Sequence, residues 1–166
     1  SSDVCSSDLS SGSTAFCRGQ TIRLWVDIPG TFTWSTGSQE DTIQVSEAGL
    51  YQVQVMDVCS TYHQLNVNVQ VYELPDIRIG VTDSIGCFPF NTNFQVLGSG
   101  YSSLSWNLGN GQSSALPSPQ ALYTEPGDYQ VSLSATSSQG CTRMAERPKT
   151  ISVFTKPTAD RKSTRL

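Results

Sequence analysis

Apolar and polar residues alternate with a period of two along most of the chain, the pattern of strands that bury one face. In residues 50–58, Tyr51, Val53 and Val55 fall on one face, and glutamine and methionine residues fall on the other. The alternation recurs at residues 22–26, 32–34, 65–71, 77–79, 94–96, 104–108, 129–135 and 151–153. No window of the sequence shows the period of an amphipathic helix, so we expect an all-β fold.

Turn residues separate these strands at short intervals. Examples are Pro29-Gly30, Asn110-Gly111 and Pro126-Gly127. Short strands with frequent turns are typical of β-sandwiches. A long strand ends just before Pro75, and Pro157 follows the last strand in the same way. We therefore predict two tandem immunoglobulin-like β-sandwiches, one at residues 10–73 and one at residues 75–156.

One ordered set of residues occurs in each half: a cysteine, a tryptophan, a tyrosine two residues after a glycine, and a second cysteine. Its members are Cys17, Trp34, Tyr51 and Cys59 in the first half, and Cys87, Trp106, Tyr129 and Cys141 in the second. A tryptophan on a central strand fills the space between two sheets, and a tyrosine after a turn glycine can pin the preceding loop. We interpret the tryptophans and tyrosines as core and motif residues.

The chain has five cysteines, of which four belong to the repeated set. Four cysteines permit three pairings, and neither a Cys-x-x-Cys spacing nor a histidine-rich tract accompanies them, which disfavours a zinc site. We interpret Cys17, Cys59, Cys87 and Cys141 as disulfide cysteines. If each pair lies within one half, the bonds join Cys17 to Cys59 and Cys87 to Cys141. Disulfides indicate an oxidising, extracytoplasmic compartment.

The two ends of the chain differ from the rest. Residues 1–9 and 161–166 show no strand or helix period and resemble translated sequencing-adapter read-through. Disordered linkers are the alternative. We expect a non-native or disordered tail at residues 1–9, which includes Cys5, and a linker with a non-native tail at residues 157–166.

Composition narrows the range of functions. Only 14% of the residues are charged and the formal net charge is -4. The sequence therefore shows no electrostatic footprint for nucleic acid or anionic lipid. No run approaches the roughly 18 apolar residues that a membrane-spanning helix needs. A low charge fraction with many uncharged polar residues favours a secreted β protein.

Groups that could carry catalysis are few. His63 is the single histidine and has no adjacent serine or cysteine motif to activate. Asp57, Asp83 and Asp128 are single acids near strand ends, which we interpret as solvated. No dense carboxylate cluster marks a calcium site. We therefore predict that the chain is not an enzyme and has no metal site and no cofactor.

Trp25 is the residue with the clearest signal for binding. It falls in the alternation with Arg23 and Asp27, so it should point away from the core. An exposed aromatic ring beside polar groups suits a protein or glycan partner, and packing against a neighbouring repeat is the alternative. Residues 66–72 could also pair with an added strand if their edge is uncovered.

Two segments of the second half carry a resemblance to a family. They are Trp106-Asn107-Leu108-Gly109-Asn110-Gly111 and Tyr123-Thr-Glu-Pro-Gly-Asp-Tyr129-Gln-Val-Ser-Leu133. They resemble the Trp-Asp-Phe-Gly-Asp-Gly and Tyr-x-x-Pro-Gly-x-Tyr-x-Val-x-Leu motifs of PKD domains, and the likeness covers residues 75–156. It implies an immunoglobulin-like sandwich. Both motif aspartates are asparagines here, which removes two carboxylates that a calcium site or charge network would use.

The first half is similar to the immunoglobulin-like repeats that accompany PKD domains in large secreted or surface proteins of gliding bacteria. The segments that carry this likeness are Cys17-Arg-Gly-Gln-Thr-Ile-Arg-Leu24, Trp34-Ser-Thr-Gly37 and residues 49–55. The resemblance implies a fragment of a secreted or cell-surface multidomain protein, acting as a non-catalytic spacer or adhesion segment beside neighbouring repeats. The alternative is an accessory carbohydrate- or protein-binding module of a secreted degradative enzyme, because PKD-like domains also flank catalytic domains.

Overall fold

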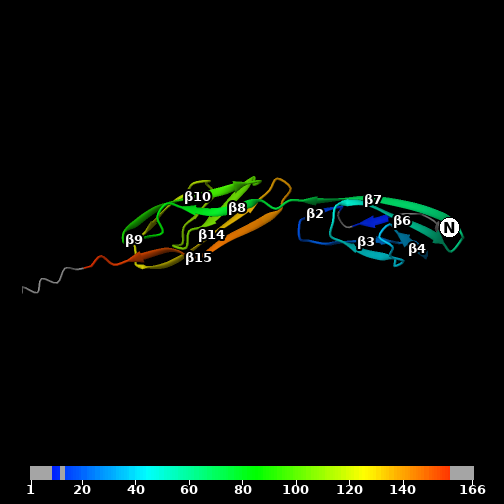
Figure 1. The fold of residues 1–166 in the computed structure, drawn as a ribbon, viewed down its shortest axis with the longest axis horizontal. Coiled ribbons are helices and arrows are strands. Elements are labelled where there is room, and N and C mark those ends of the chain that lie inside the picture. Colours follow the sequence, from blue (N-terminus) through cyan, green and yellow to red (C-terminus); the bar gives the residue numbers. More distant parts are fainter. Residues whose placement is uncertain (1–8, 12–13, 158–166) are drawn as a thin grey trace, which may run out of the picture. The chain divides into compact units, whose positions relative to one another are not determined.

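The computed structural model describes residues 9–11 and 14–157. The regular secondary structure in that part of the chain consists of β-strands alone (Figure 1). The chain divides into two compact units, unit 1 at residues 1–73 and unit 2 at residues 74–166. The expected tails lie outside the described residues except for Leu9 and Pro157, and Cys5 lies outside them as well. No described segment forms a helix long and apolar enough to span a membrane.

Unit 1 is built from two sheets. The first has the order β1–β3–β5 and comprises β1 (Leu9–Ser11), β3 (Ile22–Val26) and β5 (Thr42–Val45). The second has the order β2–β7–β6–β4 and comprises β2 (Ala15–Cys17), β7 (Tyr62–Tyr72), β6 (Gly49–Asp57) and β4 (Gly30–Trp34). Strand β2 runs parallel to the end of β7, whereas the other strand pairs of unit 1 are antiparallel.

Alternate residues of both sheets meet in the core of unit 1. Leu24 of β3, Ile43 of β5 and Val53 of β6 are buried, while their neighbours Arg23 and Gln44 are exposed. Each fully buried side chain of this kind contributes about 1.5–3 kcal/mol. A register slip of one residue would turn this set of side chains to solvent, so the alternation fixes the register.

Unit 2 repeats this topology with one additional strand. One sheet has the order β13–β10–β8 and comprises β13 (Gln120–Tyr123), β10 (Phe90–Ser99) and β8 (Asp76–Val81). The other has the order β12–β11–β14–β15–β9 and comprises β12 (Ser113–Ser114), β11 (Ser103–Asn107), β14 (Gly127–Thr136), β15 (Thr142–Phe154) and β9 (Ile85–Cys87). Strand β9 runs parallel to the end of β15, as β2 does to β7.

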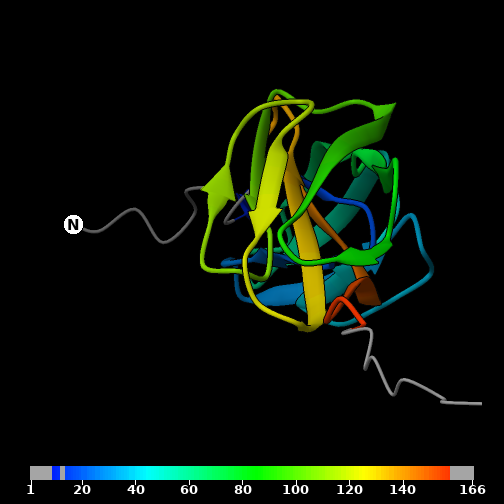
Figure 2. The ribbon, with the colours of Figure 1, turned by 90° about the vertical axis from the view of Figure 1, so that its left-hand side faces the viewer.

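The core of unit 2 forms between these two sheets. The green strands β8 and β10 belong to one sheet and the orange strand β15 to the other (Figure 2), and buried residues of both sheets form one cluster. Trp106 of β11 is 1% exposed, and its ring centroid lies 5.9 Å from that of Phe94 on β10. The prediction of an all-β chain with two tandem sandwiches is therefore confirmed.

Candidate functional site

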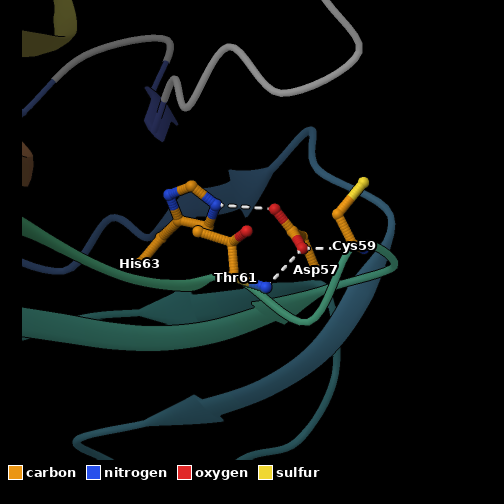
Figure 3. Close-up of polar contacts among 4 residues, drawn as sticks. All are labelled: Asp57, Cys59, Thr61 and His63. Carbon is orange, nitrogen blue, oxygen red and sulfur yellow. Dashed lines mark hydrogen bonds and ion pairs between the residues drawn. The ribbon is translucent and has the colours of Figure 1, made fainter.

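The β6–β7 hairpin end of unit 1 holds a buried carboxylate. Asp57, the last residue of β6, is 6% exposed. Its Oδ1 accepts hydrogen bonds from the N–H groups of Cys59 and Thr61, each at 2.8 Å, and its Oδ2 lies 2.8 Å from His63 Nε2 (Figure 3). The expectation of a solvated acid at position 57 is wrong, because the turn folds its own N–H groups onto the carboxylate.

These contacts hold the pKa of Asp57 below its ordinary value of 3.8. The hydrogen bond to His63 is the largest cause, and the N–H of Thr61 is the next. Donors that bond to the charged form of a carboxyl group favour that form. An ionised carboxylate only accepts hydrogen bonds, so His63 Nε2 carries the proton between them.

The equivalent turn of unit 2 shows which of these contacts are structural. Ser137 takes the place of Asp57, and its Oγ accepts a hydrogen bond from the N–H of Cys141 at 3.1 Å. Asp57 Oδ1 accepts the corresponding bond from Thr61. Side chains of this kind close turns by binding nearby backbone groups. Asp57 therefore closes its turn as Ser137 does, and the contact with His63 is an addition particular to unit 1.

The contacts that Asp57 makes at this hairpin end fix a turn. A catalytic base needs to lie within hydrogen-bond reach of the nucleophile it activates. Figure 3 shows Asp57 between His63 and Cys59, with the cysteine sulfur pointing away from the imidazole ring. Within residues 9–11 and 14–157, no group of three or more histidine, cysteine or acidic residues could hold a metal ion.

Exposed apolar side chains flank this polar group. Met56 is 43% exposed, Val58 69% and Tyr62 54%, and Met56 and Tyr62 are cross-strand partners. The equivalent positions of unit 2 hold only hydroxyl side chains: Thr136, Ser138 and Thr142. Clustered exposed apolar residues mark interaction surfaces. The hairpin end of unit 1 is thus suited to contact with another protein.

We expect Asp57→Asn to destabilise unit 1 and to reduce its sensitivity to acid. Because the pKa of Asp57 is lowered by folding, its ionised form stabilises the protein above the unfolded value near 3.8, and this contribution is lost as the pH falls through the folded value. Denaturant unfolding of the full chain from neutral to acid pH measures the effect. Asp83→Asn in unit 2 is the control, and an unchanged acid-side decline in Asp57→Asn would contradict the assignment.

The repeated tryptophans and tyrosines bind the same kinds of carbonyl in both units. Each indole N–H donates to a carbonyl of the loop after its strand, and each tyrosine hydroxyl donates to the carbonyl four residues earlier. The bonds are Trp34 to Glu40 (2.8 Å), Trp106 to Leu116 (2.9 Å), Tyr51 to Glu47 (3.1 Å) and Tyr129 to Glu125 (2.9 Å). They tie loops to the sheets, as a tyrosine corner does.

The turn that follows β11 is formed by glycine and asparagine residues. Gly109 has a φ of 79°, and a Cβ there would lie 2.5 Å from a carbonyl oxygen of β14. Gly111 has a φ of 84°. Asn107 Oδ1 accepts the N–H of Gly109 at 3.0 Å, and Asn110 Nδ2 donates to Leu122 O at 3.0 Å. An aspartate carboxylate could not make the second bond, because it has no proton to donate.

The cysteines of unit 1 do not form the expected bond with each other. Cys17 of β2 lies opposite Tyr72, the last residue of β7. Cys59 lies at the other end of β7, three residues before its first residue, Tyr62. The eleven residues of β7 span about 33 Å. A disulfide needs Cα atoms about 4.4–6.8 Å apart. A disulfide between Cys17 and Cys59 is therefore excluded.

Unit 2 repeats this geometry. Cys87 of β9 lies opposite Phe154, the last residue of β15, and Cys141 directly precedes Thr142, the first residue of β15. The prediction of a disulfide between Cys87 and Cys141 is therefore also wrong. Cys17 takes part in a disulfide, and so does Cys141, whereas Cys87 carries an exposed free thiol. Spacing along the chain did not reveal that the two cysteines of each half lie at opposite ends of a long strand.

Trp25 lies on the outer face of the β1–β3–β5 sheet and is 38% exposed. Arg23 and Gln44 are exposed on the same face and are cross-strand partners, and Thr42 is the partner of Trp25 on β5. The ring is thus accessible beside polar side chains.

Comparisons with known proteins place the second half of the chain in a family. Residues 75–153 match the family model of the PKD domain, which confirms the resemblance. The PKD1 domain of the Vibrio cholerae metalloprotease PrtV is 27% identical over 49% of this chain and 99% of its own, with a TM-score of 0.43. The PKD1 domain of Vibrio anguillarum Epp is 25% identical over 49% and 96%, with a TM-score of 0.40.

A fragment of intimin in complex with the intimin-binding domain of its translocated receptor shares the fold over both units. It is 13% identical over 87% of this chain and 64% of its own, with a TM-score of 0.50. None of the curated proteins matches the sequence.

Proposed function

Because residues 75–153 form a PKD domain, a type found in extracellular proteins, we propose that the chain is a non-catalytic spacer or adhesion segment of a secreted or cell-surface multidomain protein. PKD and immunoglobulin-like domains are typically non-catalytic modules. Disulfide bonding of Cys17 and Cys141 supports an oxidising, extracytoplasmic compartment. The proposed modules are residues 10–73 and 75–156.

The observation that carries this proposal is a parallel pair of strands in each unit. Strand β2 runs beside the end of β7, and β9 runs beside the end of β15. Backbone hydrogen bonds join each pair: Arg18 N–H to Tyr72 O (2.8 Å), Gln70 N–H to Thr14 O (2.8 Å), Phe88 N–H to Phe154 O (3.0 Å) and Ser152 N–H to Ser84 O (2.8 Å). The edge of β7 at residues 70–72 is therefore covered by β2 and not open to an added strand.

Such a pair resists extension. Strand β2 is near the start of unit 1 and β7 ends it, so tension applied to the two ends of the unit slides one strand along the other. The hydrogen bonds between them are then loaded together rather than one after another. Each contributes about 0.5–1.5 kcal/mol net. The ion pair of Arg18 with Glu73 lies at the same place but is exposed, so it adds little.

We expect Gln70→Pro to lower the force that unfolds unit 1. Proline has no N–H, so the bond from Gln70 to Thr14 O is lost, whereas the pairing of β7 with β6 ends at Val69. Single-molecule stretching of the full chain measures both units in one trace. Unit 2 is the internal control. If the unfolding force of unit 1 is unchanged, the paired strands do not bear the load.

Trp25 favours the second candidate function, an accessory binding module of a secreted degradative enzyme. Its exposed ring beside polar side chains is suited to stacking on a sugar. If this function is correct, the full chain binds a glycan on an array and Trp25→Ala removes the signal. Leu122→Ala, which truncates another exposed apolar residue, should leave it intact. Equal binding by both variants, or no binding by the wild type, would exclude this candidate.

A further inference from the structure

Unit 1 has an open sheet edge beside a groove. β4 is the last strand of the described β2–β7–β6–β4 sheet. A groove of about 560 Å³ runs between β4 and the loop that follows it, and we call it the β4 edge groove. Its lining residues are Gly30, Thr31, Phe32, Thr33, Gln39, Glu40 and Asp41. The groove lies entirely within unit 1.

Part of the corresponding edge is occupied in unit 2. There β12 pairs with β11, the counterpart of β4, at Trp106 and Asn107. The connection that contains β12 covers residues 108–119, whereas residues 35–41 alone join β4 to β5. The shorter connection leaves no residues for a further strand. In unit 2 a short strand thus covers the edge beside Trp106 and Asn107, the counterparts of Trp34 and Ser35, whereas no described strand pairs with the outer side of β4 in unit 1.

The backbone of β4 presents unused groups to this groove. In an antiparallel pair, alternate residues direct their N–H and C=O groups to the partner strand and the others direct them outward. The N–H of Ser35 donates to Gln52 O on β6. The N–H of Trp34 instead donates to Ser38 O, on the side of β4 that faces away from β6. Phe32, two residues before Trp34, therefore points its N–H and C=O outward, and neither has a backbone partner among the described residues.

The opposite wall of the groove is acidic and fixed in place. Glu40 and Asp41 have exposed side chains, and neither forms an ion pair with a described residue. Their carbonyl groups are held by the core, because Glu40 O accepts the indole N–H of Trp34 at 2.8 Å and Asp41 O accepts the N–H of Val26 at 3.0 Å. The two acidic side chains thus extend from a backbone that is anchored to Trp34 and to β3.

We propose that the β4 edge groove binds an extended, basic segment of a partner protein, which adds to the sheet as a strand next to β4. The outward groups of Phe32 supply main-chain hydrogen bonds, as in other cases of strand addition. Lysine or arginine side chains on the groove side of the added strand meet Glu40 and Asp41, which gives the charge preference. This inference is independent of the choice between spacer and accessory module.

The test uses the full chain and a synthetic peptide, Lys-Thr-Val-Lys-Val-Thr-Lys. We expect saturable binding that weakens as salt is added, because screening reduces the attraction between exposed charges. Amide hydrogen exchange should slow at Phe32 on binding, whereas the N–H of Thr33, which already faces β6, should change little. A matched peptide with glutamate in place of lysine should not bind.

Two variants separate strand addition from simple charge attraction. Glu40→Gln combined with Asp41→Asn should weaken binding at least tenfold, while Glu125→Gln in unit 2 should leave it unchanged. The lysine peptide can be N-methylated on its odd-numbered or on its even-numbered residues. Each pattern keeps the charge but removes the main-chain N–H donors along one edge of the strand. The pattern that blocks the edge facing β4 should fail to bind. Equal binding by both patterns, no slowing of exchange at Phe32, self-pairing of β4 between two copies, or no binding would overturn the proposal.

Discussion

Trp106→Ala is expected to cost unit 2 about 3–5 kcal/mol of its free energy of unfolding. The indole is 1% exposed and packs against Phe94, so its loss leaves a large cavity. It also removes the donor of the 2.9 Å bond to Leu116 O, which anchors the loop that contains β12. Since single domains are stable by only about 5–15 kcal/mol, this loss approaches complete unfolding of the unit.

Denaturant unfolding of the full chain, followed by hydrogen exchange at amides of β11 and β14, measures this effect. Trp106→Phe keeps most of the apolar volume and should cost less. Leu122→Ala is the matched control, because Leu122 also lies in unit 2 and its side chain is 49% exposed, so its removal leaves no cavity. A similar loss for the Leu122 and Trp106 variants would show that Trp106 does not organise the core of unit 2.

Tyr123→Phe is expected to remove part of the alkaline denaturation of unit 2. The side chain of Tyr123 is fully buried and its hydroxyl donates to Leu108 O at 2.7 Å. Burial raises the pKa of Tyr123 to about 12, and the nearby Tyr129 adds to the effect. Since the folded value lies above the ordinary value of 10.0, the protonated phenol stabilises the fold below pH 10.0, and this contribution is lost as the pH rises toward 12.

At neutral pH the same variant should be less stable by about 1–3 kcal/mol, because Leu108 O loses its buried donor. Unfolding measured from neutral to alkaline pH, with phenolate absorption recorded in parallel, checks both effects. Tyr62→Phe, at an exposed site, should change neither. Ionisation of Tyr123 together with the exposed tyrosines, in a chain that stays folded, would contradict the role assigned to its burial.

The sequence was most informative about the long central strands. Val53 and Val55 in β6, and Val131 and Leu133 in β14, alternate with polar residues because one face of each strand is buried. The short strands β2, β9 and β12 have two or three residues, too few to show a period. These short strands form because neighbouring strands supply their hydrogen-bond partners. Their own residues therefore do not predict them.

The polar contacts of the candidate site were harder to predict. Asp57 and His63 are six residues apart, and only the geometry of the turn between β6 and β7 brings them together. The position of Cys59 within that turn similarly decides how far it lies from Cys17. Residue type predicted that Trp34 and Tyr51 are structural, but the partners of their hydrogen bonds depend on how the loops fold.

The central claim is that each unit bears load through its parallel strand pair, and the direction of pulling tests it most directly. The full chain is stretched once from its two ends and once through attachment points placed so that β7 and β15 peel away from their neighbours. We predict two unfolding events in each case, with clearly higher forces when the chain is pulled from its ends. Equal forces in the two directions would contradict the claim that this chain is built as a load-bearing spacer.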